Sequence, residues 1–151
     1  MPQAAAPPVS RHVKVDDLPW ADWWILEAKV VHVASDGSSY TLMTRMPPGC
    51  RLPKHRHLGP VSGFTFSGSW RYLEYDWVAG PGSFIYEEPG SVHTLVVEGD
   101  EPALVIFEVT GGLVLFDEND NVVGFEDAES ARDRYRMALE AKGQELPAEI
   151  F

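Results

Sequence analysis

The chain has 151 residues and a mass of 16.8 kDa, with 44% hydrophobic and 23% charged residues, which suits one globular domain and is too apolar for a disordered chain. Acidic residues outnumber basic ones by 23 to 12, so the net charge of −11 argues against nucleic acid or an anionic membrane as a partner, because both are polyanions. The apolar runs are too short for a membrane span, no signal-peptide core is visible, and a lone cysteine forms no internal disulfide, so we expect a cytoplasmic protein.

In chain order, residues 1–10 contain three prolines and no apolar period, and we expect a flexible arm there, followed by one domain over 11–151. Short runs rich in β-branched and aromatic residues then alternate with turn-forming residues. The predicted strands are 26–33, 40–46, 61–66, 70–77, 83–86, 93–98, 103–109, 113–116 and 121–124. So many short strands, about ten residues apart, predict an all-β sandwich or barrel with antiparallel strands.

One segment near the C-terminus has a helical pattern. Asp127 stands where an N-cap belongs, and Gly143 stands where a C-terminal cap belongs, so we predict a helix over 128–142. Ala131, Tyr135 and Leu139 fall on one face of this helix. We expect that face to pack on the outside of the barrel or against a partner subunit.

Three of the five histidines have a spacing typical of a metal site: His55, His57 and His93. On a helix, residues two apart point about 200° away from each other, whereas on a strand they share a face with Cα atoms about 6.5–7 Å apart. His55 and His57 can therefore converge on one cation if they lie on a strand, with His93 supplied by a neighbouring strand. The alternative is that all three are ordinary polar residues of the barrel.

The residues around these histidines resemble the two motifs of the cupin superfamily. Gly49 precedes His55-Arg56-His57 by five intervening residues and Gly68 follows, while Gly82 is followed by Gly90-Ser91-Val92-His93. The resemblance implies a jelly-roll β-barrel with one metal inside and, here, one C-terminal α-helix. The glutamate that usually follows the second histidine by four residues is replaced by Val61. The resemblance therefore implies three histidine ligands with no carboxylate among them.

A short cupin with three histidines is similar to the acetylacetone-cleaving and 2,4′-dihydroxyacetophenone dioxygenases, which are grouped with ChrR-type cupins. Those enzymes have a glutamate six residues before the third histidine, and Glu87 stands at that position. The resemblance implies an Fe(II) cofactor, a carbonyl substrate that binds through two oxygens, cleavage of its C–C bond with O₂, and a catalytic role for Glu87. Histidine-only sites also suit Zn, Ni, Cu and Mn, so the residues alone do not choose the metal.

Two other functions stay open: a non-catalytic zinc sensor or storage protein, and a metal-dependent isomerase or decarboxylase. We also expect a homodimer or homotetramer, because the barrel edges, the predicted helix and the tryptophans at 20, 23 and 24 offer apolar surface. These tryptophans could form a lid or a subunit contact, or pack in the core. The remaining aromatic residues, Tyr72 among them, are each more typical of core packing than of a pocket.

Overall fold

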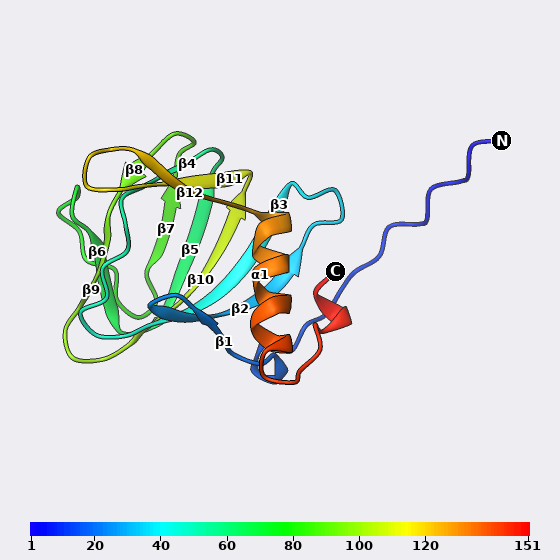
Figure 1. Ribbon diagram of the computed structural model, residues 1–151, viewed down its shortest axis with the longest axis horizontal. Coiled ribbons are helices and arrows are strands. Elements are labelled where there is room, and N and C mark those ends of the chain that lie inside the picture. Colours follow the sequence, from blue (N-terminus) through cyan, green and yellow to red (C-terminus); the bar gives the residue numbers. More distant parts are fainter.

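Antiparallel strands make up most of the regular structure in the computed structural model, which describes residues 1–151 (Figure 1). The strands are β1 (Ala21–Trp23), β2 (Leu26–Val33), β3 (Ser39–Met46), β4 (His55–His57), β5 (Val61–Ser67), β6 (Ser69–Tyr72), β7 (Phe84–Glu87), β8 (Val92–His93), β9 (Leu95–Glu98), β10 (Ala103–Thr110), β11 (Gly112–Phe116) and β12 (Val122–Asp127).

The strands form three sheets whose order gives the topology of a jelly roll. The largest has the order β1-β2-β3-β10-β5-β7, the second β12-β11-β4-β8, and the third pairs β6 with β9. All nine strand pairs are antiparallel. The predicted all-β jelly roll is confirmed, and its apolar interior lies between the sheets.

Two predicted strands have wrong boundaries, and one short strand was not predicted. Residues 70–77 do not form one strand, because the chain turns after Tyr72, where the Tyr75 amide donates to the Tyr72 carbonyl at 3.2 Å. Residues 93–98 are divided at Thr94, so that β8 pairs with β4 while β9 pairs with β6. Sequence analysis missed β1, which pairs with β2 through a two-residue turn.

The C-terminal helix α1 (Ala128–Glu140) begins and ends close to the predicted positions. Asp127 accepts from the Ser130 amide at 2.8 Å, and the Ser130 hydroxyl accepts from the Asp127 amide, which completes a capping box. The last turn closes as Gly143 adopts a φ of 72° and the Gln144 amide donates to the Leu139 carbonyl. The helix packs its buried face on β1, β2, β3 and β12, as predicted for the outside of the barrel.

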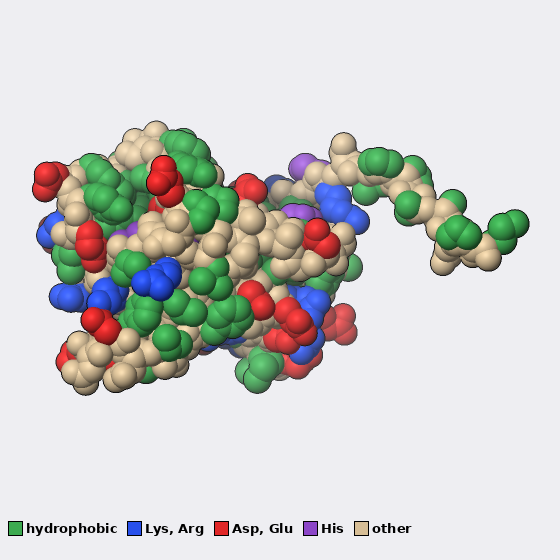
Figure 2. Space-filling model, turned by 90° about the horizontal axis from the view of Figure 1, so that it is seen from above, with side chains coloured by type: hydrophobic (Ala, Val, Ile, Leu, Met, Phe, Trp, Pro, Cys, Tyr) green, Lys and Arg blue, Asp and Glu red, His purple; other side chains and the backbone are tan.

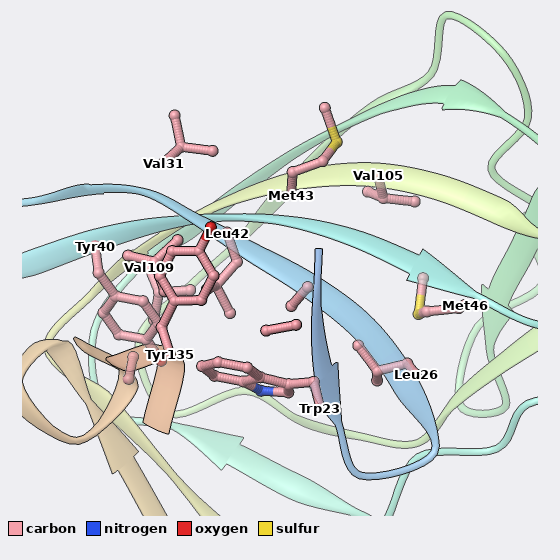
Figure 3. Close-up of a cluster of buried hydrophobic side chains, with 14 of the residues drawn as sticks. Trp23, Leu26, Val31, Tyr40, Leu42, Met43, Met46, Val105, Val109 and Tyr135 are labelled. Atoms are coloured by element: carbon pink, nitrogen blue, oxygen red, sulfur yellow. The ribbon is translucent and has the colours of Figure 1, made fainter. Parts of the chain in front are cut away.

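The apolar core continues from the barrel to the helix. Figure 3 shows Trp23 of β1 lying between Leu26 and Tyr135, so the segment before the first long strand is part of the core. The Tyr135 hydroxyl donates to the Pro19 carbonyl at 2.6 Å, which attaches the N-terminal segment to α1. One side of the cavity described below is therefore formed by the segment around Trp23 together with the C-terminal helix α1.

Outside this core, residues 1–14 form no helix or strand, and the N-terminal end of the chain extends away from the barrel (Figure 2). On the face shown there, acidic and basic side chains alternate with hydrophobic ones. Two single-turn 3₁₀ helices, Val15–Asp17 and Ala148–Ile150, complete the structure. The single α-helix is too short and too polar to cross a membrane.

Candidate metal centre

The three predicted histidines meet inside the barrel, on two adjacent strands. His55 and His57 both point inward from β4, while Arg56 between them is exposed. His93 lies on β8 directly opposite His55 in the antiparallel register, so all three rings share one face of the sheet. The ring centroids are 4.7–5.0 Å apart, and one ring nitrogen of each histidine lies within 4.8 Å of those of the other two.

The hydrogen bonds of His55 fix which of its nitrogens faces the cluster. Its Nδ1 lies 2.9 Å from the carbonyl oxygen of Pro53, and since a carbonyl can only accept, Nδ1 carries the proton. The Nε2 of His55 is thereby left with a lone pair. This is the arrangement by which proteins orient a histidine that binds a metal.

The other two histidines carry buried nitrogens that have no hydrogen-bond partner. These are Nδ1 of His57 and both ring nitrogens of His93, a residue that is fully buried. Buried polar atoms are nearly always paired in folded proteins, so three such nitrogens in one cluster need an explanation. Nitrogen lone pairs that converge in this way suit a transition-metal cation, and the residues present therefore fit a metal ion.

Glu87 lies against the same cluster, on β7. Its carboxylate oxygens are 3.2 Å from Nε2 of His57 and 3.4 Å from Nε2 of His93, and its side chain is about 5% exposed. The hydroxyl of Tyr72 donates a hydrogen bond to Oε1 of Glu87. The Tyr72 ring also stacks on the His93 imidazole with a centroid distance of 3.7 Å, so Tyr72 positions both groups.

Burial controls the charge of this cluster. It lowers the pKa of His57 to about 3 and that of His93 to about 2, and nearby histidines add to both effects. Burial also lowers the pKa of His55. The three imidazoles are therefore neutral near pH 7, which is the form that binds metals. Burial raises the pKa of Glu87 to about 7, although the hydrogen bond from Tyr72 opposes this shift.

Glu87 lies opposite Val61, the residue that replaces the usual cupin glutamate. Val61 is buried on β5, and its partner across the antiparallel pair with β7 is Glu87. Residues directly opposite each other point to the same face of a sheet, so both side chains line the interior. The chain thus lacks a carboxylate at position 61 but presents one from the neighbouring strand.

A mostly apolar cavity of about 140 Å³ extends from the histidine cluster towards α1. At one end it is lined by His55, His57, Val61, Tyr72 and Glu87. At the other end it is lined by Trp23, Trp24, Glu126 and Arg134. Its volume is close to that of engineered apolar cavities that bind benzene, which have about 150 Å³.

With this geometry in place, the chain can be compared with known proteins. The family model of the ChrR cupin-like domain matches residues 9–113. The chain belongs to this family. No curated protein sequence matches the chain.

Solved structures of cupins agree with this membership. The fold of an RmlC-like cupin from Ralstonia eutropha superposes with a TM-score of 0.86 at 27% identity, covering 95% of this chain and 96% of that one. An acetylacetone dioxygenase from Acinetobacter johnsonii superposes with a TM-score of 0.74 at 16% identity, covering 91% and 97%. The anti-sigma factor ChrR of Rhodobacter sphaeroides, in complex with SigE, gives 0.53 at 18%, covering 65% and 51%.

The cupin motifs locate the histidine cluster but not the other residues around the cavity. Tyr72 carries no motif of its own, and its role depends on a contact between β6 and β7 that the sequence pattern does not show. Of the tryptophans expected to form a lid, subunit contact or core, Trp23 is buried in the core and Trp24 is exposed beside the cavity. Glu126 and Arg134 were not predicted as site residues, and both lie after residue 113, where the family match ends.

Proposed function

We propose that this cupin is an Fe(II)-dependent dioxygenase that cleaves the C–C bond next to a carbonyl group in a β-diketone or an α-hydroxyketone. The observation that carries the proposal is a cluster of three buried, neutral histidines with one adjacent carboxylate, at the end of an apolar cavity. The similarity to an acetylacetone dioxygenase over 91% of this chain supports the same class of reaction.

In this proposal His55, His57 and His93 hold the iron. When bound there, Fe(II) would hold the two oxygens of the substrate and bring O₂ next to them, since three protein ligands leave coordination positions open. Three neutral ligands leave the charge of the cation uncompensated. The site therefore favours a substrate that binds as an anion, such as the enolate of a diketone.

Glu87 is the residue that we propose to accept the substrate proton. It lies in the wall of the cavity beside the histidine cluster, where its carboxylate can reach a substrate held at that cluster. Tyr72 holds Oε1 by a hydrogen bond, whereas Oε2 accepts no hydrogen bond and lies 3.2 Å from Nε2 of His57, beside the histidine cluster. We assign proton transfer to Oε2.

The apolar walls of the cavity exclude water around the reacting atoms. Leu42, Phe107 and Leu113 line the cavity beside the histidine cluster. With water excluded, the enolate is protected from reprotonation while the C–C bond is cleaved. Each molecule of substrate consumes one O₂, and both oxygen atoms of that O₂ end in the two shorter carboxylate or carbonyl products.

The test uses protein loaded with Fe(II) in the absence of O₂ and a panel of β-diketones and hydroxyacetophenones. We expect a visible charge-transfer band when a substrate binds, and its loss on addition of O₂, with one O₂ consumed for each molecule cleaved. Absence of both the band and O₂ uptake for every member of the panel would reject the proposal.

A metal-sensing function is the second candidate, and the family itself favours it, because the match is to a ChrR cupin-like domain and ChrR is an anti-sigma factor. Under that function the histidines hold Zn(II) and no substrate is turned over. Tight Zn(II) binding, combined with no O₂ uptake by the Fe(II) form, would favour this candidate over the dioxygenase.

We also propose that the protein is a homodimer or homotetramer. Exposed aromatic residues on the outer face of β5 and β7 support this, namely Phe64, Phe66, Phe84 and Tyr86. β7 is also an unpaired edge of the largest sheet, and such edges are usually covered. A sedimentation mass near 16.8 kDa at micromolar concentration would contradict self-association.

A further inference from the structure

The end of the cavity near α1 carries a charge that the proposed chemistry does not use. Arg134 is the only Lys or Arg residue that lines the cavity, and its side chain is exposed. It makes no hydrogen bond and no ion pair within 4.0 Å, whereas Arg132 and Arg136 on the same helix both pair with Asp133. The Arg134 guanidinium is therefore free to bind an anion that enters the cavity.

Trp23 lies next to this guanidinium. The Arg134 Cζ atom lies 5.2 Å from the centroid of the Trp23 ring, within the range of a cation–π contact. Trp23 is itself buried in the core, so the platform is rigid. A guanidinium held by a cation–π contact still has N–H donors available, and these can bind a carboxylate with two parallel hydrogen bonds.

The neighbouring turn adds an exposed indole to the same end of the cavity. Trp24 follows β1, is 69% exposed and has a φ of 62°, in the left-handed region that bulky residues rarely adopt. It is the first central residue of a two-residue hairpin turn, a position where a type II′ turn favours glycine. A large side chain kept in an unfavourable backbone conformation beside a cavity is typical of a binding site.

We propose that Arg134, supported by Trp23, binds a carboxylate of the substrate at the outer end of the cavity. This rests on the proposed function and names the substrate class more narrowly: a diketone or hydroxyketone with an acidic group remote from the carbonyls. The carbonyl end lies at the histidine cluster and the acidic end lies at Arg134. Arg134 lies outside residues 9–113, which the family model matches, whereas Trp23 lies inside them.

Glu126 is the one acidic residue at this end of the cavity, and its carboxylate already accepts a hydrogen bond. The Tyr40 hydroxyl donates to its Oε1 at 2.8 Å. Burial raises the pKa of Glu126, against the lowering effects of Tyr40 and of the Arg134 charge. Glu126 makes no ion pair with Arg134 within 4.0 Å, so it does not take up the guanidinium hydrogen bonds that a substrate carboxylate would use.

The test compares two β-diketones that differ at one end only. In 4,6-dioxoheptanoate the chain ends in a carboxylate, and in 2,4-heptanedione a methyl group replaces it. We expect protein loaded with Zn(II), which does not consume O₂, to bind the carboxylate form about tenfold more tightly by calorimetry, the low end of what hydrogen bonds to charged groups contribute. Arg134→Gln should abolish the preference, because binding of the carboxylate form loses the guanidinium hydrogen bonds.

Arg136→Gln is the matched control, because it removes an arginine from the same helix but not from the cavity. It should retain the preference, and Arg134→Lys should retain part of it. Equal affinities in the unmodified protein, or a preference that survives in Arg134→Gln, would overturn the inference. If the preference is present but neither these diketones nor any member of the wider panel supports O₂ uptake by the Fe(II) form, the dioxygenase proposal fails while the carboxylate site stands.

Discussion

The two ends of the cavity differ in almost every physical property. At the inner end, His57, His93 and Glu87 are nearly inaccessible, and their protonation is controlled by burial. At the outer end, Trp24 and Arg134 are exposed to solvent. The inner end can bind a cation and move a proton, whereas the outer end can only recognise the shape and charge of what enters.

The two ends also differ in how the chain builds them. The inner end comes from neighbouring strands in the middle of the chain, β4 with β8 and β5 with β7. At the outer end, Trp23 lies next to Arg134, although most of the length of the chain separates the two residues in sequence. Changes at the inner end should therefore affect metal binding and turnover, while changes at the outer end should affect substrate binding, substrate preference and local stability.

The largest expected effect is at the inner end. Replacing His57 with alanine removes one of three nitrogen ligands, so we expect metal content after loading to fall below about a tenth of the normal value. His32→Ala is the control, since His32 lies on β2 outside the cluster. Elemental analysis of both variants gives the measurement, and full occupancy in His57→Ala would reject the ligand assignment.

A smaller loss is expected from Glu87→Gln, which keeps the shape of the side chain but cannot accept the substrate proton. We expect kcat to fall by about 10- to 100-fold while metal content changes little, as is usual for groups that support a metal site. The exposed neighbour Glu88 gives the control variant Glu88→Gln. If Glu87→Gln loses its metal to the same extent as His57→Ala, Glu87 is a ligand and not the base.

Val61→Glu restores the carboxylate that most cupins have at this position, directly opposite Glu87. The new charge would compensate the cation and occupy a coordination position, so we expect a chelating diketone to bind about tenfold more weakly. Val61→Gln introduces a side chain of the same size without the charge. Equal weakening in both variants, measured by titration of the metal-loaded protein, would show that crowding and not charge is responsible.

Within the inner end, the histidine cluster was predictable from the sequence because its motifs are local, whereas Tyr72 was not. The two-residue spacing of His55 and His57 has meaning only on a strand, and glycines around both motifs mark the turns that bring His93 beside them. At Gly68 this constraint is visible, because φ is 76° and a Cβ there would lie 2.2 Å from the Pro102 carbonyl oxygen. Such positions leave a pattern that sequence analysis can detect.

The outer end leaves no comparable pattern. Arg134 is one of three arginines within five residues of α1, and only the rotation of the helix against β1 distinguishes it from Arg132 and Arg136. The strand β1 is three residues long, too short to show an alternating pattern, so Trp23 could be assigned equally to core, lid or interface. Contacts between distant segments, not local spacing, determine these roles.

The smallest expected effect tests the strain at the outer end. Trp24→Gly and Trp24→Ala both remove the indole, so both should weaken binding of 2,4-heptanedione by the same few-fold factor. Only glycine adopts a φ of 62° without steric cost, and an L-residue there costs about 1–2 kcal/mol. Glycine also loses more chain entropy on folding, by about 0.5–1 kcal/mol. We therefore expect the unfolding free energy of Trp24→Gly to exceed that of Trp24→Ala by about 0.5–1 kcal/mol.

Urea unfolding of the two variants gives this difference directly. Equal stability would mean that the turn relaxes when the indole is removed, and that the indole itself, through its contacts at the cavity, maintains the left-handed conformation.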